Sequence, residues 1–376
     1  MNKDIYLKLI TDSLNADYII SLFLEVDGKK YPKDEYLIIL KELIKESKNS
    51  IQKYEPERIK SINNNLDTLL NYLQYNYTRG SEKTIIIYCS ADKIWQIFKS
   101  KVPLRSSLVI RESPYLRPLI HANLLQKKIA TILLDRSKAN FYLSEYDSIS
   151  LLQSINNEVP QKVKAAGYKG YAGKKVERHI EDHLQKHFKS IYEEIIKFCN
   201  KNQCNNIILG GEKRNIDDFI SYMPNIWISR IINKINIPPE ADMKDVSSKV
   251  FEAINNYHSS REIALIEKIK QEARSKALGA YGIEAVFDAI RYKQISILAV
   301  QQNFSVPGKK CKNCTWLSIN LDTCQLCGNL MSFSQDIIDE AINESILQNA
   351  DIYIISFNSN RISEIEGIGA LLRFHL

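Results

Sequence analysis

Four cysteines near the C-terminal end carry the clearest chemical signal in the sequence. They form two Cys-x-x-Cys pairs, separated by nine residues: Cys311, Cys314, Cys324 and Cys327. Each pair can form a tight turn whose two thiolates bind one ion, and two such turns complete a tetrahedral site. Four cysteine ligands leave no position for water, so we expect a structural rather than a catalytic Zn²⁺ ion. Disulfides, the competing interpretation, are disfavoured in the cytosol.

A basic, glycine-bearing segment is the second candidate site, "AAGYKGYAGKKVERHIEDHLQKH" (165–187). Residues 162–189 contain eight Lys and Arg against three acids, a net charge of +5. Glycine lets the backbone approach a partner closely, and a basic helix N-terminus suits phosphate groups. A solvated surface loop is the alternative. The candidate RNA-binding residues are Lys164, Lys169, Gly170, Tyr171, Lys174, Lys175 and Arg178.

Three histidines follow at i, i+4 and i+8 on the helix expected after this segment: His179, His183 and His187. Two histidines at this spacing can share a metal, but "HIEDH" lacks the glutamate position of a metalloprotease helix. We expect the histidines to hydrogen-bond to RNA or to pack on a sheet. A nuclease that uses His179, His183 and Arg178 as catalytic residues is the weaker alternative.

The elements around these residues follow the pattern of an α/β protein. Short buried strands such as "KTIIIYCS" and "NNIILGG" alternate with helical segments. "KIATILLDRSKANFYLSE" predicts two strands joined by a turn at Asp135–Lys138, and "ADKIWQIFKS" (91–100) predicts a helix.

Composition bounds the class of protein. The 376 residues are enough for two or three domains, with 44% apolar and 25% charged residues and a net charge of +7. No apolar run approaches the roughly 20 residues that span a bilayer, and the N-terminus has no signal-peptide pattern. We therefore expect a cytoplasmic protein that does not enter membranes. We also expect a monomer.

Several segments resemble one protein family. "LGAYGIEAVFDAIRYKQISILAV" (278–300) and the ending "IEGIGALLRF" look like the C-terminal domain of the class-1 peptide release factors of archaea and eukaryotes, whose archaeal members carry a zinc ribbon. The helix start at residues 174–178 is similar to the family's (R/K)-(R/K)-x-E-R. The N-terminal match is weak, because "RIKS" (58–61) only approaches the family's Asn-Ile-Lys-Ser and is expected within a helix. The whole chain is most similar to the bacterial archaeo-eukaryotic release factor-like proteins, including the Balon-type hibernation factors.

This resemblance implies a three-domain release-factor-like architecture. The expected domains are a degenerate codon-recognition-like domain at 1–124, a middle domain at 125–258 and a C-terminal α/β domain at 259–376, whose zinc ribbon is inserted at 308–330. In the family, a Gly-Gly-Gln loop of the middle domain catalyses release of the peptide. Lys169, Gly170 and Tyr171 stand in the corresponding positions, and the segment has no Gln between residues 162 and 185.

Because the catalytic Gln is missing, we expect binding to the ribosome rather than peptide release. We expect a ribosome-binding factor that contacts rRNA and the tRNA acceptor end and acts in hibernation or rescue, and we favour a protein without enzymatic activity. One alternative is a peptidyl-tRNA hydrolase or tRNA nuclease that uses the histidine-bearing helix. Another is an adaptor whose C-terminal domain binds a translational GTPase.

Overall fold

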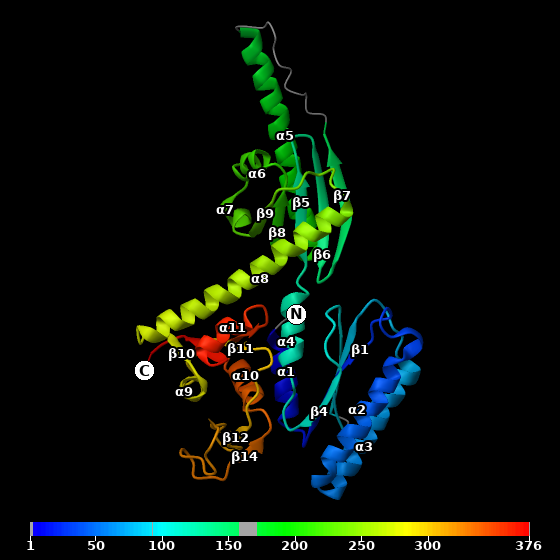
Figure 1. The fold of residues 1–376 in the computed structure, drawn as a ribbon, viewed down its shortest axis with the longest axis vertical. Helices are drawn as coiled ribbons and strands as arrows, with labels where there is room; N and C mark the ends of the chain where they lie inside the picture. Colours follow the sequence, from blue (N-terminus) through cyan, green and yellow to red (C-terminus); the bar gives the residue numbers. More distant parts are fainter. Residues whose placement is uncertain (1–2, 92, 158–170, 376) are drawn as a thin grey trace. The chain divides into compact units, whose positions relative to one another are not determined.

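The computed structural model describes most of the chain: residues 3–91, 93–157 and 171–375, with the side chains of residues 53 and 171–180 excluded. The chain divides into two compact units (Figure 1). Unit 1 combines Met1–Gln126 with Arg261–Leu376, and unit 2 is Lys127–Ser260. Both units mix helices and sheets, so the predicted α/β class is confirmed. The predicted boundaries of three domains stay a prediction.

The N-terminal part of unit 1 is an antiparallel sheet with two helices packed on it. Its strand order is β3–β2–β1–β4. Apolar side chains of both helices join those of the two central strands in one core cluster. The "RIKS" segment lies inside the second helix, as expected. The elements are β1 (Ile19–Glu25), α2 (Tyr36–Ser50), α3 (Pro56–Asn71), β2 (Thr84–Ser90), β3 (Ile94–Ser100) and β4 (Ser107–Arg111).

The prediction of a helix over residues 91–100 is wrong, because residues 94–100 form strand β3. This strand pairs with β2 from Ile94, opposite Ser90, to Ser100, opposite Thr84. Its β-branched and aromatic residues favour a strand. Trp95 packs edge-on against Tyr72 of the helical region, with ring centroids 5.5 Å apart. Cross-strand pairing and this aromatic contact outweigh the helical reading of the sequence.

The C-terminal part of unit 1 has a mixed sheet of order β10–β16–β11–β15 and a small antiparallel ribbon of order β13–β12–β14. The family-like segment "GIEAVFDAIRYKQISILAV" forms helix α9 followed by strand β11. The elements are β10 (Gly279–Tyr281), α9 (Ile283–Arg291), β11 (Ile295–Gln301), β12 (Gly308–Lys310), β13 (Leu317–Ser318), β14 (Ser332–Ser334), α10 (Ile337–Leu347), β15 (Asp351–Ile355), α11 (Ser359–Ile362) and β16 (Ile368–Leu372). The helices α1 (Lys3–Ser13) and α4 (Arg117–Leu125) belong to the same unit.

Two glycines of the family-like segments occupy positions that exclude a side chain. Gly282 precedes α9 with a φ of +81°, and a Cβ there would lie 2.8 Å from a carboxylate oxygen of Glu366. Gly367 has a φ of +79°, and its Cβ would lie 2.8 Å from the ring of Phe304. Only glycine adopts this backbone without strain, so both residues fix how α9 and β16 join the sheet.

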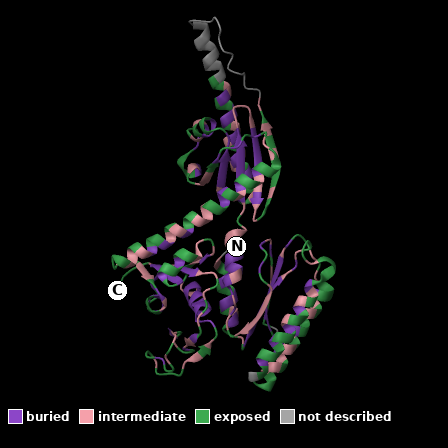
Figure 2. Cartoon of the chain, viewed as in Figure 1, coloured by how far each residue is buried: buried purple, intermediate pink, exposed green. Residues whose placement is uncertain are grey.

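Unit 2 is a five-stranded sheet of order β7–β6–β5–β8–β9 with a long helix against each face. Helix α5 packs on the face that contains Phe141, and the first half of α8 packs on the face that contains Tyr142. Figure 2 shows the central strands buried and β7 mostly exposed. The elements are β5 (Ile129–Leu134), β6 (Lys138–Glu145), β7 (Ser148–Asn156), α5 (Tyr171–Asn202), β8 (Asn206–Gly210), α6 (Lys213–Ile220), α7 (Asn225–Ile228), β9 (Ile231–Ile235) and α8 (Met243–Arg274).

The turn predicted between the first two strands of unit 2 is confirmed. Asp135 Oδ1 accepts hydrogen bonds from the backbone N–H of Ser137 (2.7 Å) and of Lys138 (2.6 Å). The side chain of Asp135 therefore stabilises this turn by accepting hydrogen bonds from the backbone of the residues that follow it. Strand β7 was missed in the sequence.

Among the helices of the described residues, none combines the length and the apolar character needed to cross a bilayer.

Candidate metal centre and RNA-binding helix

The four cysteines predicted as metal ligands lie together in the ribbon region of unit 1. Their Sγ atoms all fall within 4.8 Å of one another, the only group of this kind among the described His, Cys, Asp and Glu residues. The Sγ atoms are 3.4 Å apart for Cys311 and Cys327, and 3.2 Å apart for Cys314 and Cys324. A tetrahedral ion with Zn–S bonds of about 2.3 Å places sulfurs about 3.8 Å apart. Small shifts would therefore complete a coordination sphere.

The backbone makes the same turn at both Cys-x-x-Cys pairs. In each turn, the carbonyl of the first cysteine accepts a hydrogen bond from the residue four positions on, Thr315 (3.0 Å) or Gly328 (2.9 Å). The N–H of the first cysteine donates to the carbonyl five positions on, at 2.8 Å in both turns. Thr315 and Gly328 both have a positive φ, +59° and +73°. The two matched turns direct four thiols toward one centre.

The four thiols of this cluster differ in acidity, because burial raises the pKa of the Cys314 thiol to about 12 while that of Cys327 is lowered. Cys311 and Cys324 are buried, and the other two cysteines are half-buried. A hydrogen bond from the backbone N–H of Asn329 lowers the pKa of the Cys327 thiol to about 6. A thiolate is the form that binds metal, so one ligand is already ionised at neutral pH. The cluster could hold a metal ion with cysteine at all four positions.

Ion pairs join the ribbon to α10, a helix that is buried on all sides. Lys310, the residue before the first cysteine, lies 3.0 Å from Glu340 and 2.7 Å from Glu344. These two carboxylates raise the Lys310 pKa against the opposing effect of burial, so the lysine stays charged. The ribbon is thereby fixed to the core of unit 1.

The N-terminal end of α10 holds a buried ionic cluster that the sequence analysis did not predict. Arg117, only 3% exposed, lies 3.0 Å from Asp336 and 2.6 Å from Asp339. Arg111 lies 2.6 Å from the other oxygen of Asp339. Two arginines and two aspartates neutralise each other, which is the condition for burying charge. The cluster connects α4 and β4 to α10 and has a structural role.

The basic segment before α5 lies at the limit of what the structure describes. Lys164, Lys169 and Gly170 fall outside the described residues. Helix α5 begins at Tyr171, and its first turns include the remaining candidates, whose side chains also fall outside the description: Lys174, Lys175, Arg178 and His179. The assignment of these residues to RNA binding and of His179 and Arg178 to catalysis stays a prediction.

The last histidine of the series is part of the core. His187 is 1% exposed, and its Nδ1 accepts a hydrogen bond from the side-chain amide of Asn157 (2.8 Å). The same amide donates to Ser190 Oγ (3.1 Å). Burial lowers the pKa of His187, so the ring is neutral at pH 7. His183, one turn earlier, is half-buried. His187 therefore packs in the core, one of the two roles expected for the histidines. Its hydrogen-bond partner Asn157 was not indicated by the sequence spacing.

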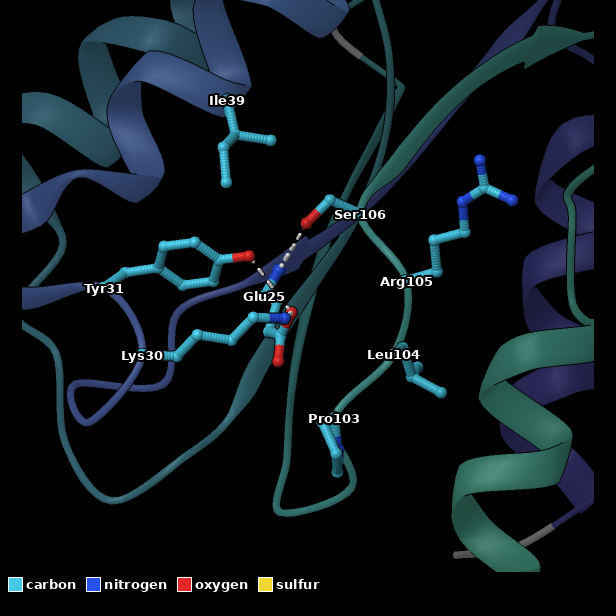
Figure 3. Close-up of a pocket in the computed structure, with 8 residues that line it drawn as sticks. All are labelled: Glu25, Lys30, Tyr31, Ile39, Pro103, Leu104, Arg105 and Ser106. Carbon is cyan, nitrogen blue, oxygen red and sulfur yellow. Dashed lines mark hydrogen bonds and ion pairs between the residues drawn. The ribbon is translucent and has the colours of Figure 1, made fainter.

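A cavity of about 460 Å³ opens in the N-terminal part of unit 1 (Figure 3). Glu25 lies in it with one carboxylate oxygen 2.7 Å from Lys30 Nζ and 3.4 Å from the hydroxyl of Tyr31. Figure 3 shows Arg105 directed away from this carboxylate. Because Glu25 is already paired within the protein, we assign the cavity no ligand. The lining residues are Glu25, Lys30, Tyr31, Ile39, Pro103, Leu104, Arg105 and Ser106.

Comparisons with known proteins identify relatives of this arrangement. Residues 114–255 match the model of the bacterial archaeo-eukaryotic release factor family 10. The chain is 23% identical to peptide chain release factor subunit 1 of Methanococcus maripaludis over 278 residues, 65% of this chain and 66% of that protein. It is 26% identical to the protein pelota homolog of Methanocaldococcus jannaschii over 219 residues, 56% and 53% of the two chains. The chain thus spans less than two thirds of the length of both relatives.

Among solved structures, Dom34 of S. cerevisiae is similar with a TM-score of 0.43 and 12% identity, over 82% of this chain and 78% of that one. The family match covers α4, β5–β9, the whole of α5 and the first part of α8, and it includes the basic segment at 165–187. Together with the two curated relatives, this match makes the chain similar to archaeo-eukaryotic release factor-like proteins, with the family model covering residues 114–255.

Proposed function

We propose that this protein is a cytoplasmic ribosome-binding factor that acts in hibernation or rescue and does not hydrolyse peptidyl-tRNA by the release-factor route. The observation that carries the proposal is the family match over residues 114–255, because this region includes a basic loop that lacks the family's Gln. This segment and the first part of α5 together carry a net charge of +5 over residues 162–189. The segment therefore keeps the basic side chains that suit RNA binding but lacks the Gln that positions water in the family.

The chemical reason lies at the position of the missing Gln. Hydrolysis of the ester between peptide and tRNA needs an oriented water and donors for the developing oxyanion. Tyr171 stands nearest to that position, and a phenol with a pKa near 10 is a poor base at neutral pH. A tyrosine ring suits stacking on a base near the tRNA acceptor end instead.

An enzymatic alternative would have to use the histidines of α5. His187 is withdrawn into the core and held by Asn157, so it has no access to a substrate. That leaves His179, His183 and Arg178, without the third histidine of the series. These are the three residues that the enzymatic alternative names, so the burial of His187 does not decide between binding and catalysis, and the missing Gln remains the argument for the binding function.

We also propose that the cysteine cluster binds one structural Zn²⁺ ion. Zinc is the usual ion for four tetrahedral thiolates, and the two matched turns supply that number of ligands. The ion would tie the two turns together and would provide no site for substrate.

The C-terminal part of the chain is the proposed site for a protein partner. The solved Dom34 structure is described as that of a factor interacting with Hbs1. By analogy of sequence with release factors, the partner proposed here is a translational GTPase. A pull-down with GTPases of the host would identify it.

The experiment for RNA binding is co-sedimentation with 70S ribosomes over a series of salt concentrations. Replacement of Lys174, Lys175 and Arg178 with Ala should weaken binding and flatten its dependence on salt, by about 0.7–0.9 in log–log slope for each phosphate that is no longer neutralised. A matched variant replaces three other exposed lysines of unit 2 with Ala and should bind as the wild type does: Lys197, Lys201 and Lys213. Equally weakened binding in both triple variants would show that the loop is not the specific contact.

A further inference from the structure

One buried carboxylate connects the cysteine ribbon to the N-terminal part of unit 1. Glu340 of α10 is 8% exposed. One of its oxygens lies 3.0 Å from Lys310 Nζ, and the other accepts a hydrogen bond of 2.6 Å from the hydroxyl of Ser113. Lys310 directly precedes the first cysteine of the ribbon, and Ser113 lies between β4 and α4. Two segments that are far apart in the sequence therefore meet on a single side chain.

The position of Lys310 depends on both Cys-x-x-Cys turns. Lys310 is the last residue of β12, and it pairs with Leu317 of β13 and with Ser332 of β14. β13 follows the first turn, and β14 follows the second. The three strands have two or three residues each, too few for a sheet that is stable by itself. Because a metal ion shared by the two turns would join both neighbours of Lys310, we expect the ribbon to hold this lysine in place only when the metal is bound.

Two buried carboxylates depend on this one lysine. Glu344 is 5% exposed and lies 2.7 Å from Lys310 Nζ, on the other side of which is Glu340. Within the part of the chain that the structure describes, Lys310 is the only cation paired with either carboxylate. A buried carboxylate that loses its cation is strongly unfavourable. Displacement of Lys310 would therefore favour an opening of this face of α10 to water.

The same face of α10 holds the segment between β4 and α4. Asn343 and Glu344 lie three and four residues after Glu340, so the three side chains share one face of the helix. The side-chain amide of Asn343, a residue 2% exposed, donates to the carbonyl of Pro114 at 3.2 Å. This bond is next in sequence to the one that Ser113 donates to Glu340. An opening that hydrates the carboxylates would therefore also weaken the contacts of the β4–α4 segment.

We propose that metal binding in the ribbon is coupled to the docking of the β4–α4 segment on α10. The metal-bound ribbon places Lys310 against the two carboxylates, and the closed face of α10 then holds the segment that follows β4 of the N-terminal sheet. Coupling between two sites is reciprocal, so a change in the β4–α4 segment must alter metal affinity by the same factor. This coupling rests on the zinc site proposed above and is independent of ribosome binding.

The test is hydrogen–deuterium exchange of the full chain, with the zinc content of every sample measured alongside. Removal of Zn²⁺ by a chelator should speed exchange of the amides of residues 111–125 by more than about tenfold, because the buried carboxylates lose their cation. Strands β5 and β8 of unit 2 should exchange as before. Lys310→Met at saturating Zn²⁺ should exchange over residues 111–125 as fast as the chelated wild type does.

Lys312→Met is the matched control. Lys312 lies on the other side of Cys311 and pairs with Glu112 at 2.9 Å, but both side chains are more than half exposed. An exposed pair contributes little to stability. This variant should therefore keep the wild-type exchange with Zn²⁺ bound and the wild-type response to the chelator.

Two further variants test the coupling even if Lys310→Met fails to fold. Glu340→Gln combined with Glu344→Gln removes both charges that need the cation, so chelation should change exchange over residues 111–125 far less than it does in the wild type. Ser113→Ala removes the donor to buried Glu340 at a site far from the cysteines in sequence. Reciprocity requires that it lower the Zn²⁺ affinity measured by competition with a chelator.

Unchanged exchange over residues 111–125 after complete loss of Zn²⁺ would overturn the coupling. Wild-type protection in Lys310→Met, wild-type Zn²⁺ affinity in Ser113→Ala, or a full response to the chelator in the double glutamine variant would do the same. A wild-type protein that takes up no Zn²⁺ would refute the zinc site and the coupling with it, and the measured zinc content separates that result from a failure of the coupling alone.

Discussion

The two matched turns of the ribbon predict that adding one methyl group at Gly328, by the substitution Gly328→Ala, will weaken metal binding. Gly328 has a φ of +73°, and a Cβ at this position would meet no atom within 4 Å. The cost of Gly328→Ala is therefore that of the left-handed backbone alone, about 1–2 kcal/mol for a residue with a Cβ. Folding of such a ribbon is coupled to its metal, so this cost should appear as a reduced apparent metal affinity. A penalty of about 1 kcal/mol corresponds to roughly fivefold weaker binding.

The assay is competition for Zn²⁺ between the full-length protein and a chromophoric chelator. Gly28→Ala is the matched control, because Gly28 has no positive φ and the nearest atoms to its Cβ would be those of the Arg79 side chain, at 3.6 Å. This control should bind Zn²⁺ as the wild type does. Thr315→Gly removes a side chain from the equivalent backbone of the other turn, φ +59°, and should leave affinity equal or improved. If Gly328→Ala binds Zn²⁺ as tightly as Gly28→Ala does, the reasoning from the turn geometry is refuted.

Three further substitutions test buried polar groups of the two units. Glu262, 2% exposed, accepts hydrogen bonds from the backbone N–H groups at 356–358, so Glu262→Gln should lower the free energy of unfolding in urea by about 1.5–3 kcal/mol, whereas exposed Glu267→Gln should not. Arg117→Met leaves buried Asp336 and Asp339 short of a cation and should cost about 3–5 kcal/mol in the same assay, with Arg214→Met as the exposed control. Burial lowers the pKa of His187 below its unfolded value, so its stabilising contribution is complete above about pH 6.5 and is lost as the pH falls. His187→Asn keeps an acceptor for Asn157 but does not titrate, and its thermal midpoint should fall less than that of the wild type on acidification.

Local patterns explain which parts of the fold were predictable from the sequence. The strand pair around Asp135 follows from two apolar runs separated by a turn with suitable chemistry, and it is present. The cysteines that come together in the ribbon are also those that the spacing indicated, because a Cys-x-x-Cys pair needs only its own turn to bring two thiols together.

Long-range contacts explain most of what the sequence did not reveal. The strand at Ile94–Ser100 depends on pairing with β2, and its apolar spacing alone was compatible with a helix. β7 lacks a regular alternation because of the bulge at Leu152, so no period of two marked it. The ion pairs of Arg117 join residues more than 200 positions apart, and no local pattern predicts such a partner.

The central claim is that this protein binds ribosomes without releasing the peptide. The most direct measurement uses 70S ribosomes with labelled peptidyl-tRNA in the P site, and records in one sample both the protein that pellets with the ribosome and the peptide that is set free. We predict salt-sensitive pelleting with no release above the rate without protein, for the wild type and also for Tyr171→Gln, because Lys169 still departs from the paired glycines of the family. Rapid release by the wild type, abolished by His179→Ala or His183→Ala, would contradict the account and would make the protein a hydrolase.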